Sequence, residues 1–406
     1  MAPKRRPCPA RPPAVELLPH RVISDRRSAL RFTPNTRTRR GQIGGPFDDA
    51  TTPPAVGQVR TLHWIAAGVL LVGLAGCSHA PKEIVAGKLG TVALDYPKSD
   101  ANIVGMFLPL AFNAYSQAGA VPSDLALPKD EVRKRLARLM RSRSGVLWIG
   151  HSTFLIRWGG LTILTDPMFS EFASPLPPLG PRRYTPPALD IAELPPIDVI
   201  IVSHDHYDHL DEPSLRLLAC RFPDAPVFVT VGDERLAANA GFKRVRGMTA
   251  GQSAVLPGVS LTALPADHNS GRMPFDETRV QALSWSLRSN GRSLFFAGDT
   301  GYASFFQRIR AVFGRQDVAL VPIGAYSPRI AVEEQHASPE EAVKIASDLG
   351  ARIAVGMHWG TFPLSPEPVM QPPDRFLRAK ARGVEKRVLP IGDIIIFDGR
   401  FGPAAQ

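Results

Sequence analysis

A dense group of imidazole and carboxylate side chains lies at residues 203–209, where the chain reads Ser-His-Asp-His-Tyr-Asp-His. His204 and His206 are two residues apart, so in an extended segment their side chains point to the same side. Asp208 and His209 follow in the turn and point toward a second position. Imidazole and carboxylate ligands suit Zn²⁺, with Mn²⁺ or Fe as alternatives. A single ion would use only part of this set, so the cluster predicts a centre that holds two ions.

Three further ligand candidates occur later in the chain, and each follows a short apolar run that reads as a strand. They are His268, Asp299 and His358. Strand ends are rigid mountings for a functional site. We therefore expect these distant segments to converge on the histidine cluster, so that five imidazoles and two carboxylates surround a pair of metal ions.

The elements that must position these residues can be read from the apolar periodicity. Asn290-Gly291 predicts a tight hairpin, and Ser338 with Glu341 forms a capping box that opens a helix. Helices are expected at 130–143, 213–220 and 339–349, and strands at 146–149, 154–157, 161–164, 197–202, 227–230, 259–264, 283–288, 293–297, 318–322 and 353–357. The alternation predicts one mixed α/β domain from residue 145 onward.

The charge distribution argues against a nucleic-acid-binding protein. The formal net charge is +11, but residues 1–58 hold ten Arg, one Lys and four acidic residues, a net of +7. The other 348 residues carry only +4, whereas a nucleic-acid surface needs a basic stripe on a folded domain. The Arg- and Pro-rich residues 1–58 lack apolar periodicity, so we expect them to be disordered or a mis-annotated extension.

Residues 59–77 have the order of a secretory signal. A basic residue precedes a short apolar core, and Leu-Ala-Gly-Cys closes it at residues 74–77. This ending resembles the lipobox of bacterial lipoproteins, which implies that Cys77 carries the lipid of an exported, membrane-anchored lipoprotein in the periplasm, at the outer membrane. A short buried helix is the competing interpretation. Residues 78–144 are then expected to be a helical N-terminal extension and 145–406 the catalytic domain.

The order of the ligand motifs resembles the metallo-β-lactamase superfamily over residues 145–392. The matching features are the HxHxDH cluster, a later lone histidine, a Gly-Asp pair and a final histidine. The resemblance implies an αββα four-layer sandwich. It also implies that His204, His206 and His268 hold one metal, that Asp208, His209 and His358 hold the other, and that Asp299 bridges them.

Further short sequence motifs narrow the resemblance to the branch of N-acyl-phosphatidylethanolamine-hydrolysing phospholipases D. They include Gly-His-Ser-Thr from residue 150, Thr-Asp-Pro from 165, Gly-Asp-Thr-Gly-Tyr from 298 and His-Trp-Gly-Thr-Phe from 358. The resemblance implies that His336 lies near the active site and takes part in catalysis. Residues 1–144 match nothing firmly, so the acyl-chain selectivity does not follow from the resemblance.

Three other residues each have a structural and a functional interpretation. His336 lies in a loop, where it could be a surface histidine or a hydrogen-bond donor to substrate. His151 could support the site or the fold. Asp166 could accept a proton from a ligand histidine or shape the turn before Pro167.

The ligand cluster predicts two metal ions, expected to be Zn²⁺, and the resemblance implies a hydrolase that acts on a phospholipid or another phosphodiester. Asp299 and His336 are the expected catalytic residues. Two alternatives remain open at this point. One is a hydrolase of a small lactone, ester or cyclic phosphodiester, since one fold hosts many chemistries. The other is a non-catalytic metal-binding surface lipoprotein. The sequence does not indicate an oligomeric state.

Overall fold

The structure is a computed structural model that describes residues 83–93, 109–272 and 281–399. The expectations for residues 1–58 and for the signal at 59–77, including Cys77, lie outside these residues. Chain contacts divide the protein into Met1–Gly68 and Val69–Gln406, and every described residue belongs to the second unit. Within the described residues, no helix is long and apolar enough to cross a membrane.

Two seven-stranded mixed sheets form the centre of the domain. The first has the order β16 (Ile394–Ile396), β3 (Gly145–Gly150), β4 (Thr153–Trp158), β5 (Leu161–Thr165), β6 (Val199–Ile201), β7 (Val227–Thr230), β8 (Val245–Met248). The second has the order β15 (Glu385–Arg387), β14 (Ile353–Met357), β13 (Val318–Pro322), β12 (Arg292–Phe296), β11 (Leu283–Ser289), β10 (Val259–Pro265), β9 (Ser253–Leu256).

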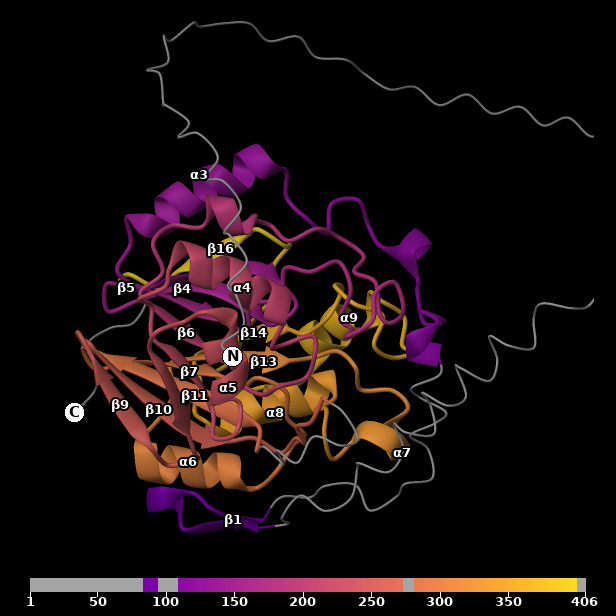
Figure 1. Cartoon of the computed structure of the whole chain (residues 1–406). Helices are drawn as coiled ribbons and strands as arrows, with labels where there is room; N and C mark the ends of the chain where they lie inside the picture. The colour runs from indigo at the N-terminus through magenta and orange to yellow at the C-terminus, as the bar shows by residue number, and fades with distance from the viewer. Residues whose placement is uncertain (1–82, 94–108, 273–280, 400–406) are drawn as a thin grey trace, which may run out of the picture. The chain divides into compact units, whose positions relative to one another are not determined.

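Helices cover the outer face of each sheet, as Figure 1 shows. The helices beside the first sheet are α3 (Lys129–Met140), α4 (Glu212–Arg221) and α5 (Glu234–Ala240). Those beside the second are α6 (Phe305–Phe313), α8 (Pro339–Asp348) and α9 (Gln371–Arg378). Short helical segments are η3 (Ala118–Ala120), η4 (Ile191–Glu193) and α7 (Arg329–Val332). The four layers are helix, sheet, sheet and helix, which confirms the expected αββα sandwich.

Local sequence signals explain several of these elements. Asn290 and Gly291 have φ of 50° and 72°, the left-handed pair that a type I′ turn between β11 and β12 requires. The Ser338 side chain accepts a hydrogen bond from the Glu341 backbone N–H, and the Glu341 carboxylate accepts one from the Ser338 backbone N–H, so the predicted capping box of α8 is confirmed. Asp211 caps α4 by accepting from the Ser214 backbone.

The order of the strands places their carboxyl ends along one edge. Strands β5 to β8 are parallel, and so are β12 to β15. Parallel neighbours need crossover connections, and the helices supply these for most of the pairs. All five residues of β13 and of β14 are buried, as expected for strands covered on both faces.

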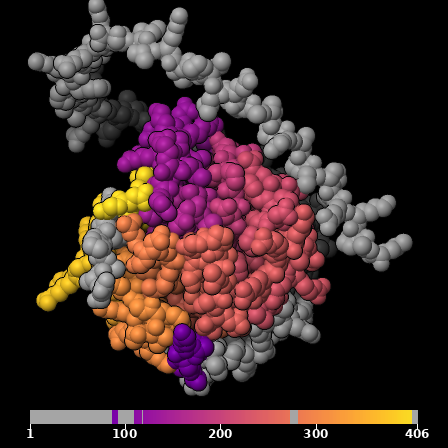
Figure 2. Space-filling view, turned by 90° about the vertical axis from the view of Figure 1, so that its left-hand side faces the viewer, coloured from indigo at the N-terminus to yellow at the C-terminus, as the bar shows by residue number. Residues whose placement is uncertain are grey.

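The segment expected to be a helical extension contains strands as well as a helix. Strands β1 (Glu83–Val85) and β2 (Thr91–Ala93) pair antiparallel around the short helix η1 (Gly87–Leu89). Arg308 of α6 donates to the carbonyl oxygens of Leu89 and Thr91. Figure 2 shows the segment in indigo against the orange surface. The helix α3 begins and ends within three residues of the predicted boundaries.

Candidate metal centre

The seven residues expected to bind metal lie together at the ends of four strands. The cluster of residues 204–209 follows β6, whereas His268, Asp299 and His358 follow β10, β12 and β14. His204, His209 and His268 have no exposed surface, and Asp299 and His358 are 2% exposed. Segments separated by up to about 150 residues therefore meet in one buried place, as the sequence predicted.

Three imidazoles form the first group. Nε2 of His204 lies 3.0 Å from Nδ1 of His206, and Nε2 of His268 lies 3.1 Å from the same Nδ1 atom. These three nitrogens form one of the arrangements of the described residues that could hold a metal ion. A set of three neutral imidazoles suits Zn²⁺.

Asp208, His209 and His358 form the second group. Oδ2 of Asp208 lies 3.4 Å from Nε2 of His209 and 3.4 Å from Nε2 of His358. Oδ2 of Asp299 lies 3.1 Å from Nε2 of His209 and 3.0 Å from Nε2 of His358. The same Asp299 oxygen is 4.0 Å from Nε2 of His268, so Asp299 lies between the two groups.

The buried atoms of the second group fit a cation. Within the described part of the chain, Nε2 of His209, Nε2 of His358 and Oδ1 of Asp299 are buried without a hydrogen-bond partner. Buried polar atoms normally have partners, and those without one need an explanation. Imidazole and carboxylate atoms that face a common point would be satisfied by a positive ion.

Hydrogen bonds behind three of the histidines fix how their rings point. His209 Nδ1 lies 2.7 Å from Oδ2 of Asp166, and His268 Nδ1 donates to the carbonyl oxygen of Gln335 at 2.9 Å. His204 Nδ1 lies 2.9 Å from Oγ of Ser203. An acceptor behind Nδ1 leaves Nε2 free for a metal and raises its basicity. The structure thus shows Asp166 in the supporting position that the sequence left open.

The carboxylates and imidazoles of the second group stabilise one another's charged forms. Burial lowers the pKa of His358, but the Asp299 and Asp208 carboxylates outweigh it and raise this pKa to about 9. The pKa of His209 is also raised well above its usual value, because the same carboxylates outweigh burial. The pKa of Asp299 is well below its ordinary value despite its burial, since His209 and His358 stabilise the carboxylate. The site therefore favours positive charge.

His336 lies at the edge of this centre. Its Nδ1 atom is 3.9 Å from Oδ2 of Asp299, and its ring centroid is 4.9 Å from that of His268. Its side chain is 16% exposed, whereas those of His268 and Asp299 are almost fully buried. Burial lowers the pKa of His336 to about 4. A lowered pKa favours the neutral ring, which can still donate a hydrogen bond through one nitrogen.

Two supporting features were not assigned from the sequence. His151, whose role was left open, lies beside Asp208, with its Nε2 atom 2.8 Å from Oδ2. Arg272 lies across the histidine cluster, because it donates to the carbonyl oxygens of Asp205 and Leu210 at 2.9 and 2.6 Å. The sequence around His151 and Arg272 does not reveal these roles, because both contacts join segments that are far apart in the chain.

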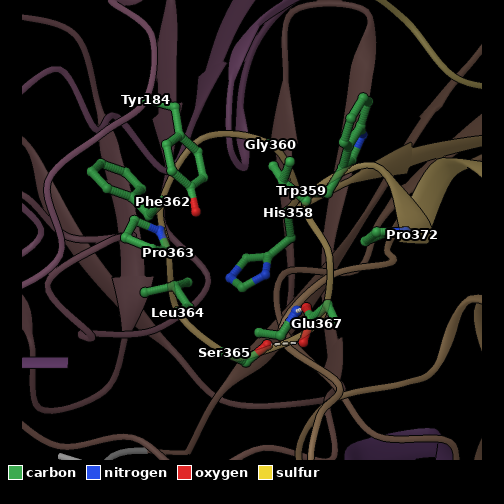
Figure 3. Close-up of a pocket in the computed structure, with 12 residues that line it drawn as sticks. Tyr184, His358, Trp359, Gly360, Phe362, Pro363, Leu364, Ser365, Glu367 and Pro372 are labelled. Carbon is green, nitrogen blue, oxygen red and sulfur yellow. Dashed lines mark hydrogen bonds between the residues drawn. The ribbon is translucent and has the colours of Figure 1, made fainter. Parts of the chain in front are cut away.

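A small pocket opens beside His358. Its volume is about 30 Å³, which is room for about one or two water molecules. Figure 3 shows the Tyr184 hydroxyl and the His358 ring pointing into the same space, with Glu367 across from Tyr184. Phe362 and Leu364 supply apolar walls. The pocket therefore lies directly beside the second ligand group.

Comparison with known proteins agrees with this fold. A family model described as a beta-lactamase superfamily domain matches residues 162–359. The chain is 38% identical over 265 residues to an uncharacterized protein of Mycobacterium tuberculosis, covering 64% of this chain and 68% of that protein. It is 35% identical over 247 residues to N-acyl-phosphatidylethanolamine-hydrolyzing phospholipase D 1 of Caenorhabditis elegans, covering 58% of this chain and 69% of the relative.

A solved structure also shares the fold. It is described as a possible metal-dependent hydrolase from Veillonella parvula, and it matches with a TM-score of 0.50 and 15% identity. The match covers 63% of this chain and all of that chain. The fold, the sequence relatives and the buried His/Asp cluster agree, and the chain therefore belongs to the metallo-β-lactamase superfamily as a hydrolase of that fold.

Proposed function

We propose that the chain is a phosphodiesterase with two Zn²⁺ that hydrolyses phospholipids in the manner of N-acyl-phosphatidylethanolamine phospholipase D. The observation that carries the proposal is the pair of ligand groups joined by Asp299, whose Oδ2 atom faces His209 and His358 at 3.1 and 3.0 Å and His268 at 4.0 Å. The activity named for the C. elegans relative supports a phospholipid substrate.

Each part of the site has a role in this proposal. Two bound Zn²⁺ ions would supply a water nucleophile at neutral pH and would neutralise charge on the phosphoryl oxygens. His204, His206 and His268 would hold one ion, and Asp208, His209 and His358 the other. Asp299, whose Oδ2 atom faces residues of both groups, would complete the ligand set.

His336 would assist the departing alcohol. It stands beside Asp299 at the partly exposed edge of the centre, where a substrate phosphate can approach. A neutral imidazole N–H within reach of the leaving oxygen stabilises the negative charge that develops there. Its Nδ1 atom is buried without a hydrogen-bond partner among the described residues, which leaves that atom free for such a contact.

The decisive experiment uses purified protein with its metal content measured on the same sample. Liposomes that contain N-acyl-phosphatidylethanolamine should yield phosphatidic acid and N-acylethanolamine, measured by mass spectrometry. A soluble bis-aryl phosphodiester and a lactone are assayed in parallel. Lactone hydrolysis without phosphodiester hydrolysis would instead support a small-ester hydrolase, and no turnover of any substrate by metal-loaded protein would support a binding protein.

Metal removal and a matched pair of variants complete this test. Dialysis against a chelator should abolish activity, and added Zn²⁺ should restore it. Asp299→Asn should lose activity and metal, whereas Asp130→Asn, an exposed residue of α3, should keep both. Full activity in protein verified to be free of metal would refute the proposal.

We further propose that Cys77 is lipidated and anchors the chain at a membrane beside its substrate. The support is the order of the basic residue, the apolar core and the Leu-Ala-Gly-Cys ending at residues 74–77. Expression in a bacterial host with a radiolabelled fatty acid should label the wild-type chain in the membrane fraction. Cys77→Ser should abolish the label, and equal labelling of both would contradict the proposal.

A further inference from the structure

His151 makes the shortest side-chain contact of Asp208. Its Nε2 atom lies 2.8 Å from Oδ2 of Asp208, whereas Nε2 of His209 and of His358 are both 3.4 Å from the same oxygen. His151 is 1% exposed, so water does not compete for this contact. The oxygen that faces the second ligand group is therefore also the oxygen that His151 contacts.

The surroundings of His151 decide which of its nitrogens carries the proton. Its Nδ1 atom is buried and has no hydrogen-bond partner within the described residues. A buried N–H without an acceptor is rarer than a buried lone pair without a donor. The proton therefore belongs on Nε2, and the imidazole donates it to Asp208.

This arrangement differs from that of three of the five expected ligand histidines. His204, His209 and His268 each have a partner at Nδ1, which directs the Nε2 lone pair toward the centre. His151 has no such partner, and its Nε2 atom is committed to the carboxylate. Although the ring stands within the same group of atoms as Asp208, His209 and His358, its geometry suits support of Asp208 rather than direct binding of an ion.

The backbone of His151 connects it to a second ligand. It occupies the turn between β3 and β4 at φ 54°, a left-handed conformation that costs energy for a residue with a side chain. Its N–H donates to Oγ1 of Thr361 at 2.8 Å, and its carbonyl accepts from the backbone N–H of His358 at 3.2 Å. The same carbonyl accepts from Nε1 of Trp148 at 2.8 Å. One turn thus holds Asp208 by its side chain and His358 by its backbone.

We propose that His151 is a positioning residue that orients Asp208, and that occupancy of the metal position formed by Asp208, His209 and His358 depends on its Nε2–H donor. The first position, formed by His204, His206 and His268, makes no contact with His151 among the interactions of the described chain, so it should be much less affected. The inference rests on the proposed two-metal centre.

Two substitutions with the same backbone strain test the donor itself. His151→Phe keeps an aromatic ring in the left-handed turn but removes the N–H. His151→Gln places an amide N–H near the former Nε2 atom and restores a donor to Asp208. Metal-free proteins are titrated with Zn²⁺ against a competing chelator and with Co²⁺, whose visible absorption reports each site as it fills.

The expected result is a selective loss at one position. Wild-type protein should bind two ions. His151→Phe should lower the affinity of the position formed by Asp208, His209 and His358 by about 10–100-fold, while the other position keeps its affinity. His151→Gln should recover most of the lost affinity. The urea unfolding midpoint of each metal-free protein serves as the control for folding.

Several outcomes would overturn the inference. Two tightly bound ions in His151→Phe would show that the donor is not needed, and equal loss in both variants would assign the ring a role as ligand or as packing. Uniform loss of both ions in His151→Phe would contradict selectivity. A wild-type chain that binds one ion would overturn the two-metal centre itself, and the inference with it, which separates the two failures.

Discussion

Nδ1 of His209 lies 2.7 Å from Oδ2 of Asp166, and neither side chain has any exposed surface. The same carboxylate accepts from the backbone N–H and the hydroxyl of Ser203, both at 2.7 Å. Asp166 therefore holds the residue that precedes the histidine cluster as well as one histidine within it. Burial raises the pKa of Asp166, although these hydrogen bonds oppose the rise.

Asp166→Asn should weaken metal binding by about 10–100-fold, as is typical when the partner of a ligand histidine is lost. The amide has an oxygen at only one of the two carboxylate positions. Its NH₂ group must therefore face either the Ser203 backbone N–H or the two donors that meet Oδ2, which are His209 Nδ1 and the Ser203 hydroxyl. Metal affinity is measured by competition with a chelator. Asp198→Asn is the matched control, because Asp198 accepts from the Thr162 backbone at 2.8 Å outside the site. Equal affinity in the two variants would contradict the role of Asp166.

The fold and the metal-binding cluster were predictable because their signals are local. Apolar runs that end in His or Asp identify strands and place ligands at their ends. Asn290-Gly291 and Ser338 act through backbone geometry within a few residues, and both predictions are confirmed. The metal-binding roles of the seven residues stay predictions, although the structure brings the side chains together.

Other features depend on contacts that no short stretch of sequence contains. His151 meets Asp208 across 57 residues, and Arg272 meets Leu210 across 62. Helix α6 was missed, although Phe305, Phe306 and Ile309 are buried on one side of it, a spacing that could have revealed it. The edge strands β8 and β9 are four residues long and only partly buried, so their apolar pattern is weak.

Replacing His336 should slow the hydrolysis of substrates with poor leaving groups far more than that of substrates with good ones. If its N–H assists the departing alkoxide, His336→Ala should lower kcat for an alkyl phosphodiester by about 10²–10⁴-fold. A nitrophenyl ester needs little assistance, so its kcat should fall much less. The ratio of the two rates is the measurement, with metal content as the control. Equal losses for both esters would indicate that His336 acts on the metals or on the fold.

Arg272 should stabilise the loop that carries the first ligand group. Its guanidinium stacks on Tyr207 at 4.0 Å and donates to the carbonyl oxygens of Asp205 and Leu210, and its side chain is 6% exposed. Arg272→Met keeps the stem but leaves these carbonyls unpaired, so the free energy of unfolding should fall by about 2–3 kcal/mol.

The control for Arg272 is Arg216, because both guanidinium groups form an ion pair with Glu212, at 3.6 and 2.8 Å. Arg216 is 57% exposed and lies 2.8 Å from the carboxylate, so Arg216→Met should cost less than about 1 kcal/mol. Urea unfolding of metal-free protein measures both variants. Similar losses of unfolding free energy in the two variants would show that the burial of Arg272 does not increase the stabilisation from its contacts.

His358 should make the stability of the metal-free chain depend on pH. Its pKa is raised from 6.5 to about 9, because Asp299 and Asp208 outweigh the effect of burial. A raised pKa means that the protonated ring stabilises the folded state below about pH 6.5, and that this contribution disappears as the pH rises through about 9. His209 has the same sign of shift, so it acts in the same direction.

The measurement compares chelator-treated wild-type protein with His358→Gln by urea unfolding from pH 6 to pH 9.5. The wild-type advantage should be largest at pH 6, up to about 3 kcal/mol, and should shrink toward pH 9.5. Glutamine cannot take up a proton, so the comparison isolates the charge on one ring. An advantage that stays constant across this range would mean that His358 is neutral in the metal-free fold. In that case the Asp299 and Asp208 carboxylates would not form ion pairs with His358. The close contacts of the second group would then stabilise the protein only when a metal ion is bound.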